Sequence, residues 1–145
     1  MNSTIRAMKE TDRSHILEMM RIFYTSPAVL SNGSEAIFAA DFNACVSDSP
    51  YLEGYVFENG EEIQGYAMAA RSFSTEFGRP CIWIEDLYVK DKYRGLGLGS
   101  RFLRFMESLY PDALLRLEVE AENERAIHVY QNCGFEELPY IEMKK

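Results

Sequence analysis

The sequence predicts a single domain of mixed α/β structure that spans residues 1–145. Helical and strand patterns alternate along the chain, and no linker or low-complexity stretch divides them. The length suits one domain with its own hydrophobic core. Past the middle of the chain, an apolar strand over residues 81–89 leads into a glycine-rich turn that opens an amphipathic helix. Together these observations indicate one α/β unit.

The N-terminal half is expected to contribute one strand and two helices. The strand covers residues 5–8, the first helix runs from Thr11 or Asp12 to about Tyr24, and the second runs from its cap at Ser34 to about Ser47. The first helix ends before Pro27, because proline disfavours helical geometry in the residue before it. The second helix is expected to carry Ile37, Ala40, Ala44 and Cys45 along one side.

The rest of the chain is expected to alternate strands and helices. Two strands, residues 51–58 and 62–72, meet at the hairpin signal Asn59-Gly60. After a break at 78–80 come a strand over 81–89, a helix over 99–110, a strand over 114–120, a helix over 123–133 and an extended segment over 135–143. Gly134 suits the C-terminal cap of the last helix.

Composition and charge argue against several classes of function. The net charge of −8 is unfavourable for general nucleic-acid binding, which needs a basic surface. It is compatible with attraction of a cationic acceptor, and equally with the solubility of an acidic protein. No apolar run reaches the length of about 20 residues that spans a bilayer, and no signal pattern opens the chain. We therefore expect a cytoplasmic protein without a membrane partner.

The three cysteines, Cys45, Cys81 and Cys133, are interpreted as reduced structural thiols. They are odd in number, widely spaced and set among apolar residues. The two histidines, His15 and His128, lie in predicted helices without a local nucleophile signature. The sequence therefore predicts neither a catalytic cysteine nor a metal site.

The glycine-rich turn over residues 95–99 is the strongest functional signal. Glycines let the backbone approach a ligand, and the free N–H groups at the start of a helix attract phosphate. A P-loop would need Gly-Lys-Ser/Thr, whereas this chain has Leu-Gly-Ser at 98–100. A dinucleotide site would need a third glycine where Ser100 stands. Glu118 and Glu120 lie at the right distance downstream, so this alternative is weakened but not excluded.

Two motifs resemble the GCN5-related N-acetyltransferase (GNAT) family, which binds acetyl-coenzyme A. Arg94-x-x-Gly97-x-Gly99 is similar to the family signature R/Q-x-x-G-x-G/A. A second region of the family is similar to Asn123-Glu124-x-Ala126-x-x-x-Tyr130-x-x-x-Gly134-Phe135. Segments 65–68, 84–89 and 93–100 look most like the diamine (polyamine) acetyltransferase branch.

The resemblance implies a single-domain fold with a central, mostly antiparallel sheet, a splayed pair of parallel strands and about four flanking helices. It also implies acetyl-coenzyme A as co-substrate and no metal. Amides of the turn would hold the pyrophosphate, and the strand edge before it would pair with the pantetheine arm. The cofactor-binding residues implied are Leu87, Tyr88, Val89, Arg94, Gly95, Leu96, Gly97, Leu98, Gly99, Ser100 and Asn123.

Several of these residues have alternative roles. The N–H of Leu87 would face the thioester oxygen, but Leu87 and Val89 could also simply pack in the core. Arg94 could contact phosphate or brace the turn. Asn123 would cap its helix and could also reach the pantetheine amide.

The catalytic residues that the resemblance implies are Glu85 and Tyr130. Glu85 matches the candidate base of the diamine branch, acting directly or through water. Strand alternation places Glu85 and Asp86 on opposite faces unless a bulge intervenes, so Asp86 could instead bind a cationic acceptor or pair with Arg94 or Lys92. Tyr130 matches the tyrosine that protonates the leaving sulfur; without the resemblance, an aromatic core anchor would be the preferred interpretation.

The predicted partner is a small-molecule amine, acetylated by direct transfer in a ternary complex. Polyamine-like acceptors are the first choice, with aminoglycosides, amino acids and protein N-termini as alternatives. A module that binds acyl-coenzyme A or polyamine without catalysis is a rival from a different class. Tyr24, Glu35 and Asp41 could line the acceptor pocket. A homodimer could form if an exposed C-terminal strand paired across a two-fold axis.

Overall fold

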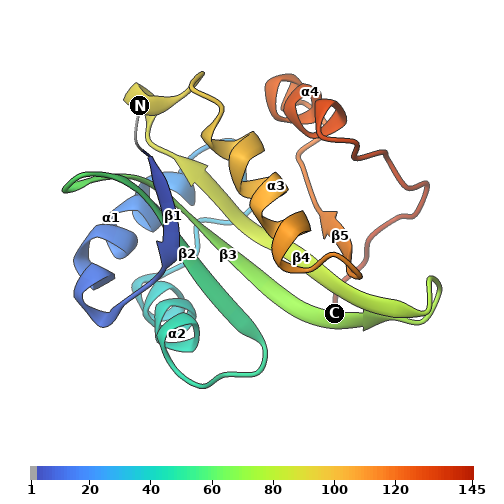
Figure 1. Ribbon diagram of the computed structural model, residues 1–145, viewed down its shortest axis with the longest axis horizontal. Coiled ribbons are helices and arrows are strands. Elements are labelled where there is room, and N and C mark those ends of the chain that lie inside the picture. The colour runs from blue at the N-terminus through green and yellow to red at the C-terminus, as the bar shows by residue number, and fades with distance from the viewer. Residues whose placement is uncertain (1–2) are drawn as a thin grey trace.

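The computed structural model describes residues 3–145, which form one five-stranded sheet flanked by four α-helices (Figure 1). The strands are β1 (Thr4–Ala7), β2 (Leu52–Asn59), β3 (Glu62–Ser74), β4 (Arg79–Val89) and β5 (Leu114–Leu117). The helices are α1 (Arg13–Phe23), α2 (Glu35–Val46), α3 (Leu98–Leu109) and α4 (Glu124–Asn132). The strand order follows the chain, and only the pair β4–β5 is parallel. This architecture confirms the predicted fold class.

The sheet separates two hydrophobic cores. Helices α1 and α2 cover one face, and α3 and α4 cover the other (Figure 1). On the first face, Phe38 and Phe42 of α2 are buried in the same cluster as Tyr66 of β3. On the second face, Phe102 of α3 packs with Ile84 of β4. Each helix pair therefore fixes one side of the central strands β3 and β4.

Helix α2 begins where the sequence predicted but buries a different side. The hydroxyl of Ser34 accepts a hydrogen bond from the N–H of Ile37 at 3.2 Å, which confirms the cap. Of the expected apolar side, Cys45 packs against the core, whereas Ile37 is 50% exposed and Ala40 is exposed as well. Phe38 and Phe42, one helical turn apart, are buried instead, and their rings remove more apolar surface from water.

The hairpin and the last helix form as expected. Gly60 has φ +63° in the turn between β2 and β3, and Gly134 has φ +92° just after α4. The side chain of Asn123 caps α4 by accepting from the N–H of Ala126 at 3.3 Å. Asp12 precedes α1 but does not cap it, because its carboxylate accepts from the guanidinium of Arg6.

Several boundaries differ from the sequence expectation, and three of the differences affect the site or its surroundings. Strand β4 starts at Arg79, inside the expected break, and β5 ends at Leu117 rather than at residue 120. The C-terminal segment 135–143 pairs with no strand in the part of the chain that the structure describes, so the expected C-terminal strand is absent there. Within residues 3–145, none of the helices has the length and apolarity needed to cross a membrane.

Candidate active site

Strands β4 and β5 run together for only four residues and then separate. Their ladder joins Cys81–Ile84 to Leu114–Leu117 and stops there, whereas β4 continues to Val89. On its other side β4 stays paired with β3, through Leu87 opposite Ala67. The β5-facing edge of residues 85–89 therefore has no strand partner among the described residues. Backbone groups along such an edge can pair with an extended ligand.

The glycine turn stands directly beyond this free edge, at the start of α3. Gly95 and Gly97 have φ +81° and φ +79°, a backbone region that other residues rarely adopt. Gly97 is the N-cap of α3, so the first N–H groups of the helix lack helical partners. A Cβ added at Gly97 would meet no protein atom within 4 Å. The turn is therefore open in front, and its geometry suits an anion.

Arg94 braces the turn in this structure. Its Nε donates to the carbonyl oxygen of Val89 at 2.9 Å, and its Nη1 pairs with Asp91 at 2.9 Å. Its guanidinium also lies 5.7 Å from the centre of the Tyr88 ring. The Nζ of Lys92 lies 3.9 Å from the Oε2 of Glu62. The expected alternative in which Asp86 pairs with Arg94 or Lys92 is therefore wrong.

Arg125 is a candidate site residue that the sequence interpretation missed. It lies in the first turn of α4, and its Nη2 lies 3.8 Å from the position that a Cβ on Gly95 would take. An exposed cation thus lies beside the glycine turn. Sequence spacing gave no sign of this, because the approach of α4 to the start of α3 is a tertiary contact.

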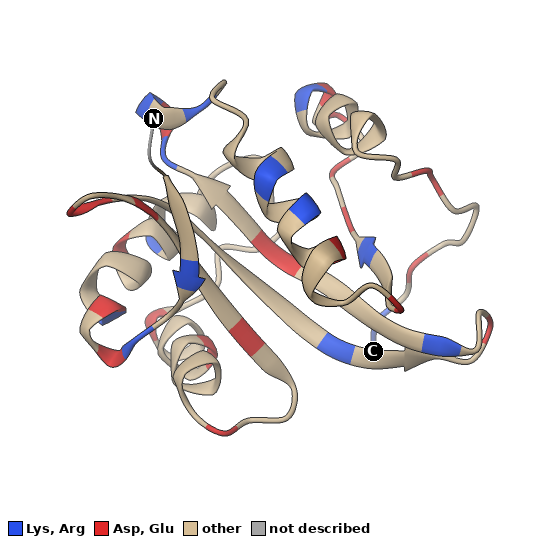
Figure 2. Cartoon of the chain, viewed as in Figure 1, with Lys and Arg blue, Asp and Glu red and all other residues tan. Residues whose placement is uncertain are grey.

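A β-bulge occurs at the acidic pair in the middle of β4, where Figure 2 shows an acidic band. Met68 lies opposite Asp86 and Ala69 lies opposite Ile84, so Glu85 is an extra residue that faces no partner on β3. Ile84 and Leu87 both pack toward α3, although residues three apart in a regular strand point to opposite faces. The extra residue in the bulge shifts the alternation of side chains by one position. Glu85 and Asp86 therefore both lie on the side of α1 and α2.

Asp86 is buried on that side, with 4% of its surface exposed. The hydroxyl of Tyr24, just after α1, donates to its Oδ1 at 2.8 Å, and the hydroxyl of Tyr66 donates to its Oδ2 at 2.7 Å. Burial raises the pKa of Asp86, while the two donated hydrogen bonds lower it. Tyr24, one of three residues considered for the acceptor pocket, is thus tied to the acidic pair.

Several carboxyl groups converge around Glu85. Glu85 itself is exposed, and partial desolvation of its carboxyl group together with the charges of Asp86 and Glu142 raises its pKa. Burial, with the charges of Asp86 and Glu85, raises the pKa of Asp41 in α2 to about 6. A hydrogen bond shared with Glu142, with burial, raises the pKa of Glu118 to about 7. These shifts describe a region of negative potential that would favour a positively charged ligand.

Glu35 lies outside this group of acids. Its carboxylate pairs with the guanidinium of Arg21 at 2.7 Å on the surface. The structure thus gathers Tyr24 and Asp41 around Glu85 and leaves Glu35 in a separate surface pair.

Tyr130 lies on the opposite side of the sheet from the acids. Its ring packs against that of Phe135, with 6.2 Å between the ring centroids, and against the cluster that contains Leu87. Burial raises the pKa of Tyr130, so its hydroxyl keeps its proton at neutral pH. Among residues 3–145, the hydroxyl makes no hydrogen bond to another protein group. The side chain therefore combines core packing with a proton-bearing group that is free to act.

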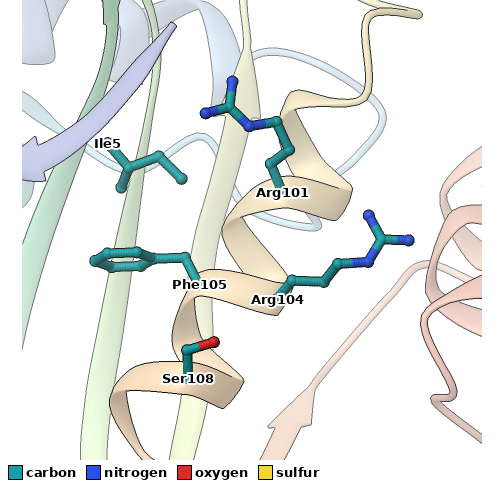
Figure 3. A pocket seen from close by; sticks show the side chains of 5 residues that line it. All are labelled: Ile5, Arg101, Arg104, Phe105 and Ser108. Carbon is teal, nitrogen blue, oxygen red and sulfur yellow. The ribbon is translucent and has the colours of Figure 1, made fainter.

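Two surface hollows lie near these elements. One of about 390 Å³ lies between α3 and β1, on the side of α3 away from β5, and is lined by Ile5, Arg101, Arg104, Phe105 and Ser108 (Figure 3). Figure 3 shows Phe105 pointing toward Ile5. The other, of about 480 Å³, lies between α1 and the end of β4 and includes Tyr88 in its lining. Only the second touches the residues expected to bind the cofactor.

Comparison with known proteins gives concordant matches. A sequence model of the Acetyltransferase (GNAT) family matches residues 16–135. Thialysine N-epsilon-acetyltransferase of Bos taurus is 31% identical over 152 aligned positions, covering 95% of this chain and 86% of that protein. Spermine/spermidine N(1)-acetyltransferase of Bacillus subtilis (strain 168) is 25% identical, covering 94% of this chain and 89% of that protein.

Solved structures share the fold. A possible acetyltransferase from Clostridium difficile 630 superposes with a TM-score of 0.82 at 18% identity, covering 99% of this chain and 96% of that one. An aminoglycoside N-acetyltransferase in complex with coenzyme A superposes with a TM-score of 0.80 at 16% identity, covering 99% and 94%. The family match extends over most of the chain and includes the turn, the acidic pair and Tyr130. The chain therefore belongs to the acetyltransferase (GNAT) family and is an acyltransferase.

Proposed function

We propose that this enzyme transfers the acetyl group of acetyl-coenzyme A to a primary amine of a small cationic acceptor, directly, in a ternary complex. The observation that carries the proposal is the gap between β4 and β5 beyond Ile84. An open anion-binding turn and Tyr130 lie on the α3–α4 side of this gap, and the acids around Glu85 lie on the α1–α2 side. Cofactor and acceptor can thus approach from opposite sides and meet at the gap.

Acetyl-coenzyme A would be held mainly by backbone groups. The amides of residues 95–100 suit the pyrophosphate, and the guanidinium of Arg125 adds a positive charge beside it. The free edge over residues 87–89 suits the pantetheine arm, with Asn123 at the start of α4 on the same side. The N–H of Leu87 would donate to the thioester oxygen, and one such donor typically contributes about 3 kcal/mol to transition-state stabilisation.

Two side chains would manage the protons. An ammonium group cannot attack a thioester, so the acceptor must first lose one proton, which Glu85 would take directly or through water. The free amine then forms a C–N bond to the acetyl carbon, and the C–S bond breaks. Tyr130 would donate its proton to the departing thiolate, which leaves as coenzyme A. The raised pKa of Glu85 makes it a stronger base, and Tyr130 carries the proton that it would donate at neutral pH.

The acceptor class follows from the charges around Glu85. Acids from α2, from the residue after β5 and from the C-terminal segment contribute to its surroundings. A polyamine-like or diamino compound would satisfy more than one of them. The thialysine and spermine/spermidine acetyltransferases named above act, by their names, on molecules of this kind. Aminoglycosides, single amino acids and protein N-termini are the alternatives that the same acids would admit.

The test is coenzyme A release from acetyl-coenzyme A over a panel of amines. The panel holds thialysine, lysine, putrescine, spermidine, an aminoglycoside and short peptides. Turnover is expected to be strongest with a small acceptor that carries two or more amino groups. A preference for peptide N-termini, or for neutral amines over cationic ones, would contradict the proposed acceptor class. An acetylated enzyme isolated after incubation with acetyl-coenzyme A alone would contradict direct transfer.

A further inference from the structure

Asp86 is the most deeply buried acid near the site, and the proposed chemistry does not use it. Its 4% exposure leaves little surface for a substrate, and each carboxylate oxygen already accepts a tyrosine hydroxyl. A surface ion pair cannot explain the presence of Asp86, because both of its hydrogen-bond partners are neutral tyrosines. Burying such a carboxylate is unfavourable, so a fold optimised only for stability would replace it.

The two tyrosines tie Asp86 to separate parts of the fold. Tyr66 belongs to β3, the strand that pairs with β4, while Tyr24 follows the last turn of α1. The ring of Tyr24 also packs against two other rings, with centroid distances of 5.3 Å to Phe23 and 5.3 Å to Phe38. The carboxylate of Asp86 is therefore anchored from helix and sheet at once, at the residue directly after the bulge.

This anchoring acts at a point where β4 could form its bulge at more than one position. A strand with one extra residue can place the irregularity at neighbouring positions, and each placement sends a different side chain to each face. With Asp86 fixed opposite Met68, the extra residue is Glu85, and its side chain must leave the strand on the α1–α2 side. A shift of one residue would send the carboxylate of Glu85 toward the α3–α4 core.

We infer that Asp86, clamped by Tyr24 and Tyr66, is a positioning residue that fixes the bulge and keeps the neighbouring Glu85 a strong proton acceptor. This inference rests on the proposed function, in which Glu85 accepts the proton of the acceptor amine. Asp86 takes no proton and touches no substrate; it acts through Glu85.

The surroundings of Glu85 are consistent with this role. The titratable groups that interact electrostatically with Glu85 are Asp86 on its own strand, Tyr24 after α1, Asp41 of α2, Glu118 after β5 and Glu142 of the C-terminal segment. All of these are acids or neutral, so none stabilises the ionised form of Glu85. After burial, the charge of Asp86 is the largest contribution to the raised pKa of Glu85. Removing that charge should make Glu85 a weaker base.

The test is a carboxyl titration by NMR on protein labelled with ¹³C at the glutamate side chains, with Glu85 assigned through Glu85→Gln. In Asp86→Asn, which keeps the shape and removes the charge, the midpoint of Glu85 is expected at lower pH than in the wild type. The midpoint of Glu35, in its remote pair with Arg21, should not move and serves as the control. An unchanged Glu85 midpoint would overturn the inference.

The second readout is the pH profile of kcat. In Asp86→Asn its acid limb should move to lower pH, and kcat at neutral pH should fall by about tenfold because the base is weaker. A lower kcat with an unmoved limb would make Asp86 a fold anchor only. If Asp86→Asn does not fold, Tyr24→Phe removes one of the two donors and should move the limb in the same direction, since Asp86 then holds its charge less firmly.

These two measurements separate this inference from the proposed function. A wild-type enzyme without turnover on any amine would contradict the proposed function, whereas the NMR titration would still decide whether Asp86 controls Glu85.

Discussion

Tyr130 combines a packed ring with a hydroxyl to which we assign the proton donation in the proposed reaction. Its ring contacts Phe135 and the α3–α4 core, while burial raises its pKa and keeps it protonated. We predict that Tyr130→Phe keeps the ring contacts and lowers kcat by about 100-fold, the usual contribution of a general acid. Steady-state kinetics with acetyl-coenzyme A would measure this. Tyr140→Phe, which removes the exposed hydroxyl bonded to Glu76, should leave kcat unchanged.

If Tyr130→Phe and Tyr140→Phe lowered kcat equally, the result would contradict the proposed role of Tyr130 as proton donor. If Tyr130→Phe lowered the Tm as well as kcat, weaker packing rather than the lost proton donor would explain the lower kcat. The two variants therefore separate the hydroxyl of the site from a hydroxyl on the surface.

Arg125 offers a residue-scale prediction on cofactor binding. Its guanidinium stands beside Gly95, so Arg125→Ala should raise the KM for acetyl-coenzyme A by about tenfold and leave kcat nearly unchanged, as for a lost charge-assisted contact. Arg104→Ala removes an arginine of α3 in the hollow beside β1 and is the matched control. If both substitutions raised the KM equally, the effect would reflect general charge rather than a contact at the turn.

At the scale of elements, the start of α3 depends on a left-handed backbone at Gly97. Gly97→Ala meets no protein atom but strains a residue at φ +79°, which typically costs about 1–2 kcal/mol. We predict a lower Tm together with a KM for acetyl-coenzyme A that rises at least tenfold. The control is Gly78→Ala, in the turn before β4, where φ is +65° and the surroundings are equally open.

The two glycine variants should share the loss of Tm and differ in KM. If Gly78→Ala raised the KM as much as Gly97→Ala did, strain rather than the anion-binding turn would explain the result. Kinetic and thermal measurements on the same preparations would decide between these outcomes.

At the scale of the whole molecule, the acids around Glu85 make stability depend on pH. Folding raises the pKa of Asp41 from 3.8 to about 6 and that of Glu118 from 4.5 to about 7. The folded state therefore holds these protons more tightly than the unfolded chain does. This contribution favours folding below the unfolded pKa values and is lost as pH rises through about 6 to 7.

We predict that the Tm rises when the pH is lowered from about 8 to about 5.5. After allowance for solvent screening, Asp41 alone contributes about 0.5 kcal/mol over this pH range, or roughly 2 °C. Asp41→Asn should accordingly raise the Tm near pH 8 and flatten the dependence. A wild-type Tm that falls over this range would contradict the prediction. The acids Asp12 and Glu35, whose pKa values are lowered by Arg6 and Arg21, act in the opposite sense only at lower pH.

The quaternary state is a second prediction at this scale. Although the expected C-terminal strand is absent, the segment exposes Ile141 at 90% and Met143 at 87%. Exposed apolar groups of this kind favour self-association. We predict a homodimer in sedimentation velocity that shifts toward monomer in the double variant Ile141→Ser with Met143→Ser. A wild-type monomer at micromolar concentration would contradict this.

Features that depend on near neighbours in the chain could be predicted from the residues alone. The caps at Ser34 and Asn123, the turn at Gly60 and the left-handed glycines before α3 follow from the conformational preferences of a few adjacent residues. The alternation of helices and strands, with two motifs at the right separation, was enough to predict the family and the fold. These features can be recognised in a single sequence because each has a local physical cause.

Features that depend on contacts between residues distant in the chain could not be predicted in this way. Only the pairing of β4 with β3 places the bulge at Glu85, and only the packing of α1 brings Tyr24 to Asp86. The approach of Arg125 to Gly95 and the burial of Phe38 rather than Ile37 were likewise set by neighbouring elements. Such contacts depend on register and on competition for buried area, which no window along the chain records.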